Sequence, residues 1–424
     1  MKFDKKNYLP RLADEKLEKY LRVFGAVSVE GPKWCGKTWT SSKYANSSIY
    51  LDEETTYEKA SLNLEMVLNE EKPELIDEWT KIPKVWDVVR RKCDSIGTPG
   101  NYILTCSTEL SEMRKKEVFH SGAGRIGKLK MYPMSLYESK DSTGEASIMD
   151  MYNGVQKDVN VTVPSLEDIA TLIIRGGWPS NLKVDKSLVG LIPNSYIEAI
   201  LDKDINDERK RDKNKMKMLL KSLARNESTV VSNQTLLKDI DNYADENVIL
   251  ESRATIADYL DVLTRLYVID LQESYSANYR SPERIGKSAK RHFIDPSLAC
   301  SILELDEEKL MNDLNTFGFM FESLVERDLK IYANYLDGHL YHFRDNVSGL
   351  EVDSILEFKG GEYAAIEIKL GNNKVEEAKA NLIKFANSMV KKPKFMCVIT
   401  ANSTYVGYDK ENEIYVLPIT ALKP

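Results

Sequence analysis

Short apolar runs alternate with longer charged segments over about the first third of the chain. The apolar runs lie at residues 25–30, 48–51, 74–77, 102–107 and 128–132. Runs of this length predict β-strands, and the charged segments between them predict helices. Strands that alternate with helices usually form a parallel sheet with right-handed crossovers. The pattern therefore predicts an α/β domain over residues 1–160.

The spacing of apolar residues becomes helical in the middle of the chain. It stays so from residue 166 to about residue 271, with a turn at Gly176-Gly177-Trp178-Pro179. Two short helical patterns, 233–240 and 252–266, stand on either side of a polar turn. Such a pair resembles a helix-turn-helix or winged-helix arrangement. We therefore predict a helical, winged-helix-like domain over residues 161–300.

The last part of the chain mixes the two kinds of pattern. A helix is predicted over residues 317–336, where an apolar stripe includes Phe317, Phe321 and Leu324. Strands, one more helix and further strands are predicted after it. We predict a third, α/β domain over residues 301–424.

Composition narrows the class of protein. A chain of 424 residues is too long for one ordinary core, and 42% hydrophobic with 29% charged residues is typical of globular proteins. The five cysteines and four histidines show no zinc or disulfide spacing. No apolar run approaches the roughly 20 residues of a membrane span, and the N-terminus is charged. These features predict a cytoplasmic protein that does not bind membranes.

One segment carries a phosphate-binding motif. It matches G-x-x-x-x-G-K-[ST] through the consecutive residues Gly31, Pro32, Lys33, Trp34, Cys35, Gly36, Lys37 and Thr38. An apolar strand precedes it and a helix-compatible segment follows, as a P-loop requires. The glycines let backbone N–H groups surround the phosphates, Lys37 can reach the β- and γ-phosphates, and the Thr38 hydroxyl can bind Mg²⁺. The motif predicts an ATP site with Mg²⁺.

Two acids end the third predicted strand. Asp77 is placed to hold the magnesium through water, and Glu78 to orient and deprotonate the attacking water. The next strand ends in polar residues, so Ser107 or Thr105 is a candidate γ-phosphate sensor. Arg125, in a glycine-containing loop, is either an arginine finger, acting in trans if the chain forms a homo-oligomer, or part of a surface ion pair.

A second group of charged residues lies near the C-terminus. Two alternating strands flank Gly360-Gly361, which predicts an antiparallel hairpin with Asp353 opposite Glu367. Lys369 shares a strand face with Glu367 because side chains alternate with period two. Two carboxylates and a lysine suit metal-dependent phosphodiester cleavage with Mg²⁺ or Mn²⁺. The alternative is an ordinary amphipathic hairpin with a surface salt bridge.

Further residues extend both interpretations of this end of the chain. The order D-x(n)-E-x-K is the core of the PD-(D/E)xK nucleases, in which a helix glutamate such as Glu322 often faces the metal. Arg344 is a candidate phosphate contact. Bases at residues 209–217 and at Lys287, Lys290 and Arg291 can bind the backbone of DNA or RNA. A solvated helix face explains such a charge run equally well, and the net charge of −7 is not that of a polybasic protein.

The chain resembles the bacterial and archaeal AAA-type ATPases whose C-terminal domain of unknown function has a PD-(D/E)xK nuclease-like fold. The segments that carry the likeness occur in family order at residues 8–11, 31–38, 75–83, 103–108, 122–125, 176–179, 293–298, 351–353 and 366–369. The resemblance implies an AAA-type parallel-sheet ATPase domain, a winged-helix-like middle and a nuclease-like end. Trp34, Cys35 and Cys106 depart from the usual residues but remove no ligand.

Three functions can be weighed on this basis. The first is an Mg²⁺-dependent ATPase coupled to a nuclease-like domain that engages nucleic acid, with Asp353, Glu367 and Lys369 as its catalytic set. The second is an ATP-switched regulatory or scaffold protein whose C-terminal fold binds partners without cleavage. The third, a small-molecule kinase, lacks a recognisable acceptor site, and Glu78 after Asp77 favours hydrolysis by water.

Overall fold

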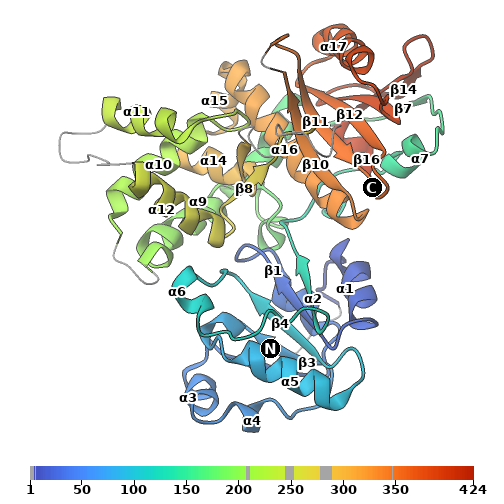
Figure 1. The fold of residues 1–424 in the computed structure, drawn as a ribbon. Coiled ribbons are helices and arrows are strands. Elements are labelled where there is room, and N and C mark those ends of the chain that lie inside the picture. Colours follow the sequence, from blue (N-terminus) through green and yellow to red (C-terminus); the bar gives the residue numbers. More distant parts are fainter. Residues whose placement is uncertain (1–3, 5, 207–210, 244–252, 277–288, 346) are drawn as a thin grey trace. The chain divides into compact units, whose positions relative to one another are not determined.

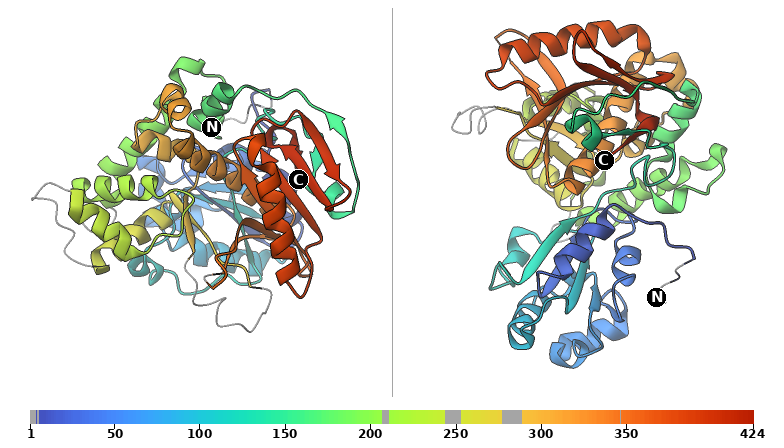
Figure 2. Two further views of the ribbon diagram at one scale, coloured as in Figure 1. Left: turned by 90° about the horizontal axis from the view of Figure 1, so that it is seen from above. Right: turned by 90° about the vertical axis from the view of Figure 1, so that its right-hand side faces the viewer.

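The computed structural model describes residues 4, 6–206, 211–243, 253–276, 289–345 and 347–424. The chain divides into two compact units, Met1–Pro133 with Thr264–Val268, and Met134–Leu263 with Ile269–Pro424 (Figures 1 and 2). Among the described helices, none is both long and apolar enough to cross a bilayer.

The first unit is built on a parallel sheet of five strands in the order β2-β3-β4-β1-β5. The strands are β1 (Ala26–Glu30), β2 (Ser47–Tyr50), β3 (Glu74–Asp77), β4 (Tyr102–Cys106) and β5 (Ile126–Lys130). The predicted strands are thus confirmed with small shifts of their ends, and so is the parallel sheet. Because β4 lies between β1 and β3, the ends of these three strands are neighbours.

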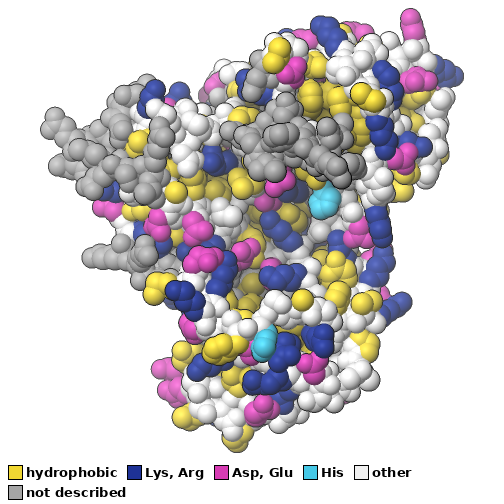
Figure 3. Space-filling view, in the orientation of Figure 1, with side chains coloured by type: hydrophobic (Ala, Val, Ile, Leu, Met, Phe, Trp, Pro, Cys, Tyr) yellow, Lys and Arg dark blue, Asp and Glu magenta, His cyan; other side chains and the backbone are white. Residues whose placement is uncertain are grey.

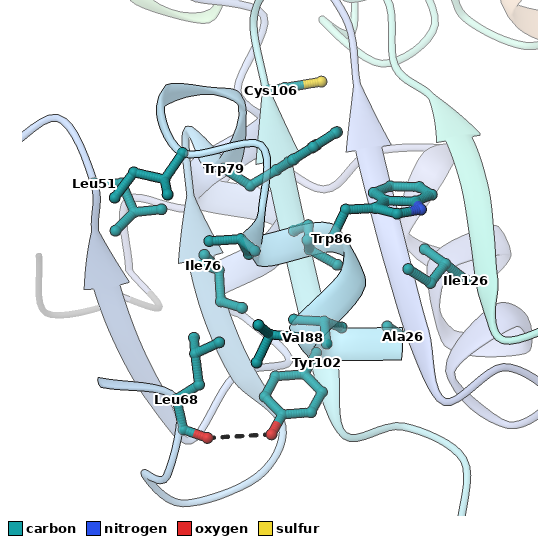
Figure 4. Close-up of a cluster of buried hydrophobic side chains, with 14 of the residues drawn as sticks. Ala26, Leu51, Leu68, Ile76, Trp79, Trp86, Val88, Tyr102, Cys106 and Ile126 are labelled. Carbon is teal, nitrogen blue, oxygen red and sulfur yellow. Dashed lines mark hydrogen bonds between the residues drawn. The ribbon is translucent and has the colours of Figure 1, made fainter. Parts of the chain in front are cut away.

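Helices pack on both faces of this sheet. They are α1 (Ala13–Leu21), α2 (Lys37–Ser42), α3 (Glu54–Leu62), α4 (Leu64–Val67), α5 (Val85–Ile96) and α6 (Glu112–Lys115). On one face Ile76, Leu104 and Trp86 of α5 belong to one buried cluster, and the Tyr102 hydroxyl donates to the Leu68 carbonyl at 3.2 Å (Figure 4). On the other face Val27 and Ile103 pack against Leu17 of α1. The strands alternate between the two cores, as a sheet buried on both faces requires.

The second unit begins with a mainly helical region. Its helices are α7 (Ile148–Tyr152), α8 (Leu166–Arg175), α9 (Leu191–Asp202), α10 (Lys213–Arg225), α11 (Asn233–Tyr243), α12 (Arg253–Arg265), α14 (Pro296–Ile302) and α15 (Glu307–Asn312). The helical stretch predicted over residues 166–271 is too long at its C-terminal end. Helix α12 ends at Arg265, and Ile269–Gln272 forms strand β8, which pairs antiparallel with β9 (Lys290–Phe293). The sequence around β8 gives no sign of this partner, which is distant along the chain.

A mixed sheet of seven strands follows, in the order β10-β11-β12-β13-β15-β14-β7. Its strands are β7 (Val159–Asn160), β10 (His339–Arg344), β11 (Glu351–Glu357), β12 (Tyr363–Lys369), β13 (Phe395–Thr400), β14 (Tyr405–Asp409) and β15 (Ile414–Pro418). A short parallel pair joins β6 (Ala146–Ser147) to β16 (Leu422–Lys423). The predicted hairpin is confirmed: β11 and β12 are antiparallel, and Gly360 and Gly361 make the turn with φ of 103° and 78°.

Two long helices cover opposite faces of this sheet (Figures 1 and 2). Helix α17 (Val375–Ser388) contributes Leu382 and Phe385 to the apolar core over β11 and β12. Helix α16 (Leu314–Tyr335) contacts β10, β11 and β12. The segment after β8 runs along the sheet edge, where the Tyr275 N–H donates to the His342 carbonyl at 2.7 Å. The β8–β9 pair is thereby joined to the edge strand β10.

Candidate functional site

The P-loop lies at the carboxyl end of β1. Steric constraints explain why two of its positions are glycine. A Cβ atom at Gly31 would stand only 2.1 Å from the Met131 carbonyl oxygen, so a side chain cannot be accommodated. Gly36 has a φ of 100°, in the left-handed region that favours glycine. Of the two unusual residues of the motif, Cys35 is buried and Trp34 is 44% exposed.

The two functional side chains of the loop are held by short contacts. The Lys37 ammonium donates to the Pro32 carbonyl at 2.8 Å and is buried. The Thr38 hydroxyl donates to Asp77 Oδ1 at 2.9 Å. The structure therefore brings the P-loop threonine and the strand-end aspartate into contact, while their part in a magnesium site stays a prediction.

The alternatives Thr105 and Ser107 both contact the strand-end acids. Thr105 Oγ1 donates to Asp77 Oδ1 at 2.6 Å and accepts from the Glu78 N–H at 3.2 Å. Ser107 Oγ donates to the Glu78 carboxylate, whose second oxygen accepts from the Ser107 N–H at 3.3 Å. Burial raises the pKa of Asp77, while the hydrogen bonds from Thr105 and Thr38 act against that rise.

Arg125 lies away from this site within its own chain. It directly precedes β5, and its carbonyl accepts from the Ala26 N–H at the amino end of β1, whereas the P-loop follows the carboxyl end. Its side chain pairs with Asp94, with Nε to Oδ1 at 2.8 Å, and both residues are largely exposed. The alternative of a surface ion pair describes this contact; an action in trans stays a prediction.

Arg11 is a residue of the nucleotide region to which the sequence assigned no role. Its guanidinium donates to the Cys35 carbonyl in the P-loop at 2.6 Å and to the Tyr132 and Pro133 carbonyls at 2.9 and 3.2 Å. It therefore ties the P-loop to the chain that follows β5. The position of Arg11 within the resembling segment 8–11 was the only signal in the sequence.

The C-terminal acids and lysine meet as predicted. The paired register Ser354 with Ile366 places Asp353 opposite Glu367 on the next step of the hairpin. The Lys369 ammonium stands between them, 2.6 Å from Glu367 Oε2 and 3.1 Å from Asp353 Oδ2. The Ile368 N–H also donates to Asp353 Oδ2 at 2.8 Å. This is a charged cluster on the interior strands β11 and β12, of which Glu367 is the most deeply buried member.

Asn381 of α17 completes this cluster and was not anticipated. Its amide donates to Glu367 Oε1 at 2.7 Å and to the Glu351 carbonyl at 2.6 Å. Burial raises the pKa of Glu367, and the Asp353 charge adds to the rise while Lys369 opposes it. Glu367 therefore has both oxygens engaged, one by a lysine and one by an amide.

Glu322 of α16 lies near the same cluster but faces a lysine. Its Oε1 is 2.8 Å from the Lys290 ammonium of β9. Burial raises the pKa of Glu322, Lys290 opposes the rise, and the Asp353 charge adds to it. The oxygen donors of Glu322, Asp353 and Glu367 suit Mg²⁺ or Mn²⁺ in chemistry. Among the described residues, however, no three His, Cys, Asp or Glu side chains converge as ready metal ligands.

A second ion pair continues the contact between β9 and α16. His292, two residues beyond Lys290, has Nε2 3.0 Å from Glu326 Oε2, and Nδ1 3.2 Å from Glu227 Oε1. Burial lowers the pKa of His292, but the Glu326 and Glu227 charges outweigh it and raise the value to about 9. Lys290 and His292 are two residues apart on strand β9, and their partners Glu322 and Glu326 are four residues apart on helix α16. The two ion pairs therefore lie side by side. The sequence offered no sign of this pairing.

The predicted nucleic-acid bases are mostly engaged with other protein groups. Lys290 is buried against Glu322, so the expectation that it lies on an open phosphate-binding face is wrong. Arg291 donates to the Val231 carbonyl at 2.5 Å and to the Asn233 amide oxygen at 2.7 Å. In the basic run, Arg211 pairs with Asp258 and Lys213 with Asp202; Arg209, Lys210 and Lys287 lie outside the described residues.

Arg344 and the surface charges complete the description of the predicted phosphate contacts. Arg344 pairs with Glu351, with Nε to Oε1 at 2.8 Å, and about half of each side chain is exposed. On the face drawn in Figure 3, Lys and Arg side chains are interspersed with Asp and Glu. The described residues of that face therefore form a mixed surface of both signs.

Comparison with known families identifies the first part of the chain. Residues 24–140 match the family model of an AAA domain. Residues 166–309 and 317–422 match two domains of unknown function, DUF8612 and DUF4143. The chain thus contains an AAA-type P-loop ATPase domain, built on the N-terminal parallel sheet. The predicted winged-helix-like middle and nuclease-like end stay predictions, because these two families carry no assigned function.

Solved structures that match include two archaeal proteins. A Walker-type ATPase of Pyrococcus abyssi is 12% identical, with 71% of this chain and 98% of that chain covered and a TM-score of 0.45. The ORC1 protein of Aeropyrum pernix, solved in complex with DNA, is 12% identical, with 69% and 91% covered and a TM-score of 0.26. These TM-scores are too low to establish a shared overall fold. No curated protein matches the chain significantly.

Proposed function

We propose that this protein hydrolyses ATP in a magnesium-dependent reaction at the end of the parallel sheet. The observation that supports the proposal best is the contact of Thr38 with Asp77 at 2.9 Å, inside a domain that matches the AAA model. The threonine hydroxyl and the aspartate are the groups that hold Mg²⁺ in P-loop enzymes. Bound magnesium would neutralise charge on the phosphates, and Asp77 and Thr38 would hold it.

The remaining residues have separate roles in this proposal. The buried Lys37 ammonium binds the β- and γ-phosphates after it releases the Pro32 carbonyl. Glu78 accepts the proton of the attacking water, and its contact with Ser107 fixes the carboxylate. Thr105 holds Asp77 and the Glu78 backbone together, which keeps the two acids in a constant relation.

Steady-state hydrolysis and nucleotide binding test this function. We expect Glu78→Gln to bind ATP but to lose hydrolysis by about 10²-fold or more, as general-base removal usually does. Lys37→Ala should lose both binding and turnover, whereas Lys115→Ala, on exposed helix α6, should retain both. Hydrolysis that persists in Glu78→Gln and Lys37→Ala would contradict the proposal.

A second function is supported by the C-terminal cluster: metal-dependent engagement of DNA or RNA phosphodiesters. The Lys369 ammonium lies 3.1 Å from Asp353 and 2.6 Å from Glu367 on the neighbouring strands β11 and β12, with Glu322 nearby. Asp353, Glu367 and Glu322 would hold the metal, and Lys369 would stabilise negative charge on the phosphate. The alternative, an ATP-switched scaffold without cleavage, is favoured by the lysines that engage these carboxylates.

Cleavage assays distinguish these two interpretations. Plasmid, single-stranded DNA and RNA are incubated with Mg²⁺ or Mn²⁺, with and without ATP. Asp353→Asn should abolish cleavage, whereas Glu351→Gln, two residues away on the same strand and half-exposed, should not. Equal activity in wild type and Asp353→Asn would identify the activity as a contaminant. Nucleic-acid binding without cleavage in wild type would favour the scaffold.

A further inference from the structure

Asp87 of α5 holds the chain segment that runs from β4 to β5. Its carboxylate is buried, and its two oxygens accept from the Phe119 N–H at 2.9 Å and from the His120 N–H at 3.1 Å. Lys84 and Arg91 are exposed and lie three residues before and four residues after Asp87, on the same side of the helix. The backbone of Phe119 and His120 is therefore fixed on the side of α5 that carries these two bases.

A second contact brings two more exposed bases to this region. The Arg114 guanidinium of α6 donates to the Lys81 carbonyl at 3.1 Å. Lys81 ends the short helix η1 (Trp79–Lys81), three residues before Lys84, and Lys116 directly follows α6. The α5–α6 surface is the name we give to four exposed bases and one exposed aromatic residue: Lys81, Lys84, Arg91, Lys116 and Phe119.

The α5–α6 surface carries positive charge that neighbouring acids do not neutralise. Residues 81–92 hold five bases and one acid, and residues 112–130 hold six bases and two acids, within a chain of net charge −7. The acids Glu112 and Glu117 pair with other bases of these segments. Among the described residues, none of the four bases of the surface takes part in an ion pair. A polyanion can therefore bind all four without breaking an ion pair of the protein.

Phe119 adds an aromatic ring to these charges. Its side chain is 79% exposed, although its N–H is bound to Asp87, so a fixed backbone presents the ring to solvent. Proteins bind single-stranded nucleic acid with this combination, because bases contact the phosphates and aromatic rings stack on the nucleobases. A duplex keeps its nucleobases stacked on one another, and an acidic protein segment offers carboxylates without a stacking partner. The ring therefore favours a single strand over either of these polyanions.

We propose that the α5–α6 surface binds single-stranded nucleic acid, with its four bases on the phosphates and Phe119 stacked on a nucleobase. Phosphates and the flat faces of nucleobases are common to DNA and RNA, so both are ligands of this surface. The surface belongs to the first unit and includes no residue of the C-terminal charged cluster. The inference is therefore independent of metal-dependent engagement at that cluster and of ATP hydrolysis.

Binding without divalent cations tests the inference apart from the C-terminal cluster. Fluorescein-labelled oligothymidylate and oligouridylate are titrated with the full chain in EDTA, without nucleotide, and fluorescence anisotropy is followed over a range of salt concentrations. We expect the double variant Lys84→Ala/Arg91→Ala to bind both about tenfold more weakly at low salt. The slope of log affinity against log salt should become shallower by about 1.4, since each phosphate contact of a single strand contributes about 0.7.

Two further variants examine the rest of the surface. Lys81→Ala/Lys116→Ala should weaken binding and lower the salt slope in the same way, which provides a second pair if the first does not fold. Phe119→Ala should weaken binding by about fivefold or more through the loss of one stacked base. Its salt slope should equal that of wild type, because no charge is removed. Phe119→Trp keeps an aromatic ring and should bind at least as tightly as wild type.

Two bases of α1 provide the matched control. Lys19 and Arg22 are exposed at the end of this helix, which packs on the opposite face of the parallel sheet from α5. Lys19→Ala/Arg22→Ala removes the same charge from the same unit and should leave both the affinity and the salt slope unchanged. Thermal unfolding, followed for every variant, identifies those that fold.

Several results would overturn the inference. One is that wild type binds neither oligonucleotide at low salt, and another is that folded Lys84→Ala/Arg91→Ala protein binds both as tightly as wild type. Equal weakening by Lys19→Ala/Arg22→Ala would mean that only overall charge matters. Displacement of the oligonucleotides by polyglutamate as effectively as by unlabelled strand would identify a surface for acidic proteins. Equal affinity for duplex DNA, with no effect of Phe119→Ala, would exclude recognition of a single strand.

Discussion

Thr38 and Asp77, 39 residues apart in sequence, are joined by a hydrogen bond of 2.9 Å between the P-loop and the end of β3. Asp77 Oδ1 also accepts from Thr105 at the end of β4, the strand between β1 and β3. One carboxylate oxygen at the end of β3 thus joins the first turn of α2, which follows β1 and the P-loop, to the end of β4. This arrangement makes the strand order itself part of the candidate magnesium site.

Thr105 should therefore affect both stability and hydrolysis. Thr105→Val removes the hydroxyl but keeps the side-chain volume, and it leaves the buried Asp77 with one donor fewer. We expect a loss of about 1–3 kcal/mol in the free energy of unfolding. The turnover number should also fall, because Glu78 loses the acceptor of its N–H. Urea denaturation and steady-state kinetics measure the two effects.

Thr105→Ser is the control for this prediction. It restores the hydroxyl and should recover most of the stability and the activity. If Thr105→Val were as stable and as active as wild type, the hydroxyl would have no part in holding the two acids.

Arg11 should control the affinity for nucleotide through the backbone carbonyls to which its guanidinium donates. Arg11→Lys keeps the charge. A lysine, however, lacks the planar guanidinium that donates to the Cys35, Tyr132 and Pro133 carbonyls together. We expect a loss of about 1.5–3 kcal/mol in stability and weaker ATP binding, because the P-loop is less constrained. Fluorescent-nucleotide titration and urea denaturation provide the measurements.

Arg22→Lys is the matched substitution for Arg11→Lys. Arg22 is exposed just after α1 and pairs only with Glu18 among the ion pairs described. The substitution Arg22→Lys should leave both the stability and the affinity for ATP unchanged. A nucleotide affinity that is the same in Arg11→Lys and wild type would show that the P-loop keeps its shape without this side chain.

The parallel sheet and the hairpin were predictable because their signals are local. The runs at 25–30 and 74–77 alternate with helices, and Gly360-Gly361 has the backbone freedom that a tight turn needs. The period of two along a strand then places Glu367 beside Lys369 without any knowledge of the fold. The position of Asp353 opposite Glu367 was predictable too, because the turn of an antiparallel hairpin fixes the register of its two strands.

The contacts that could not be predicted join residues far apart in the chain. Arg11 meets Tyr132, and His292 meets both Glu227 and Glu326, at separations for which one sequence holds no pairing information. Strand β8 was assigned to a helix for the same reason, because its partner β9 lies beyond an intervening segment. Lys290 was misassigned because a lysine in sequence gives no sign of burial beside an acid.

Arg125 should be dispensable for hydrolysis if its only role is the ion pair with Asp94. Exposed pairs of this kind contribute little to stability. We expect Arg125→Ala to keep the turnover of wild type at low protein concentration. If the residue acts in trans, wild-type turnover per chain should rise with protein concentration, and that rise should be absent in Arg125→Ala. Hydrolysis assays over a range of concentrations, with sedimentation at each, decide between these outcomes.

His292 should make the stability of the second unit depend on pH in a defined direction. Its pKa is raised in the folded chain, from an ordinary 6.5 to about 9, by the charges of Glu326 and Glu227 that outweigh burial. The folded state therefore holds a proton that the unfolded state releases between these values. The stabilisation is complete below about pH 6.5 and is lost as the pH rises through about 9. Burial raises the pKa of Glu322 and Glu367, which gives a slope of the same sign.

A comparison of variants separates the contribution of His292 from those of the two carboxyl groups. His292→Gln keeps hydrogen-bonding groups but cannot carry the charge. The melting temperature of wild type should exceed that of His292→Gln by an amount that shrinks steadily from pH 6.5 to pH 9. His339→Gln, on the exposed start of β10, should show no such change. A wild-type advantage over His292→Gln that stays constant across this range would mean that His292 carries no charge in the folded protein, and that the two glutamates are held by hydrogen bonds alone.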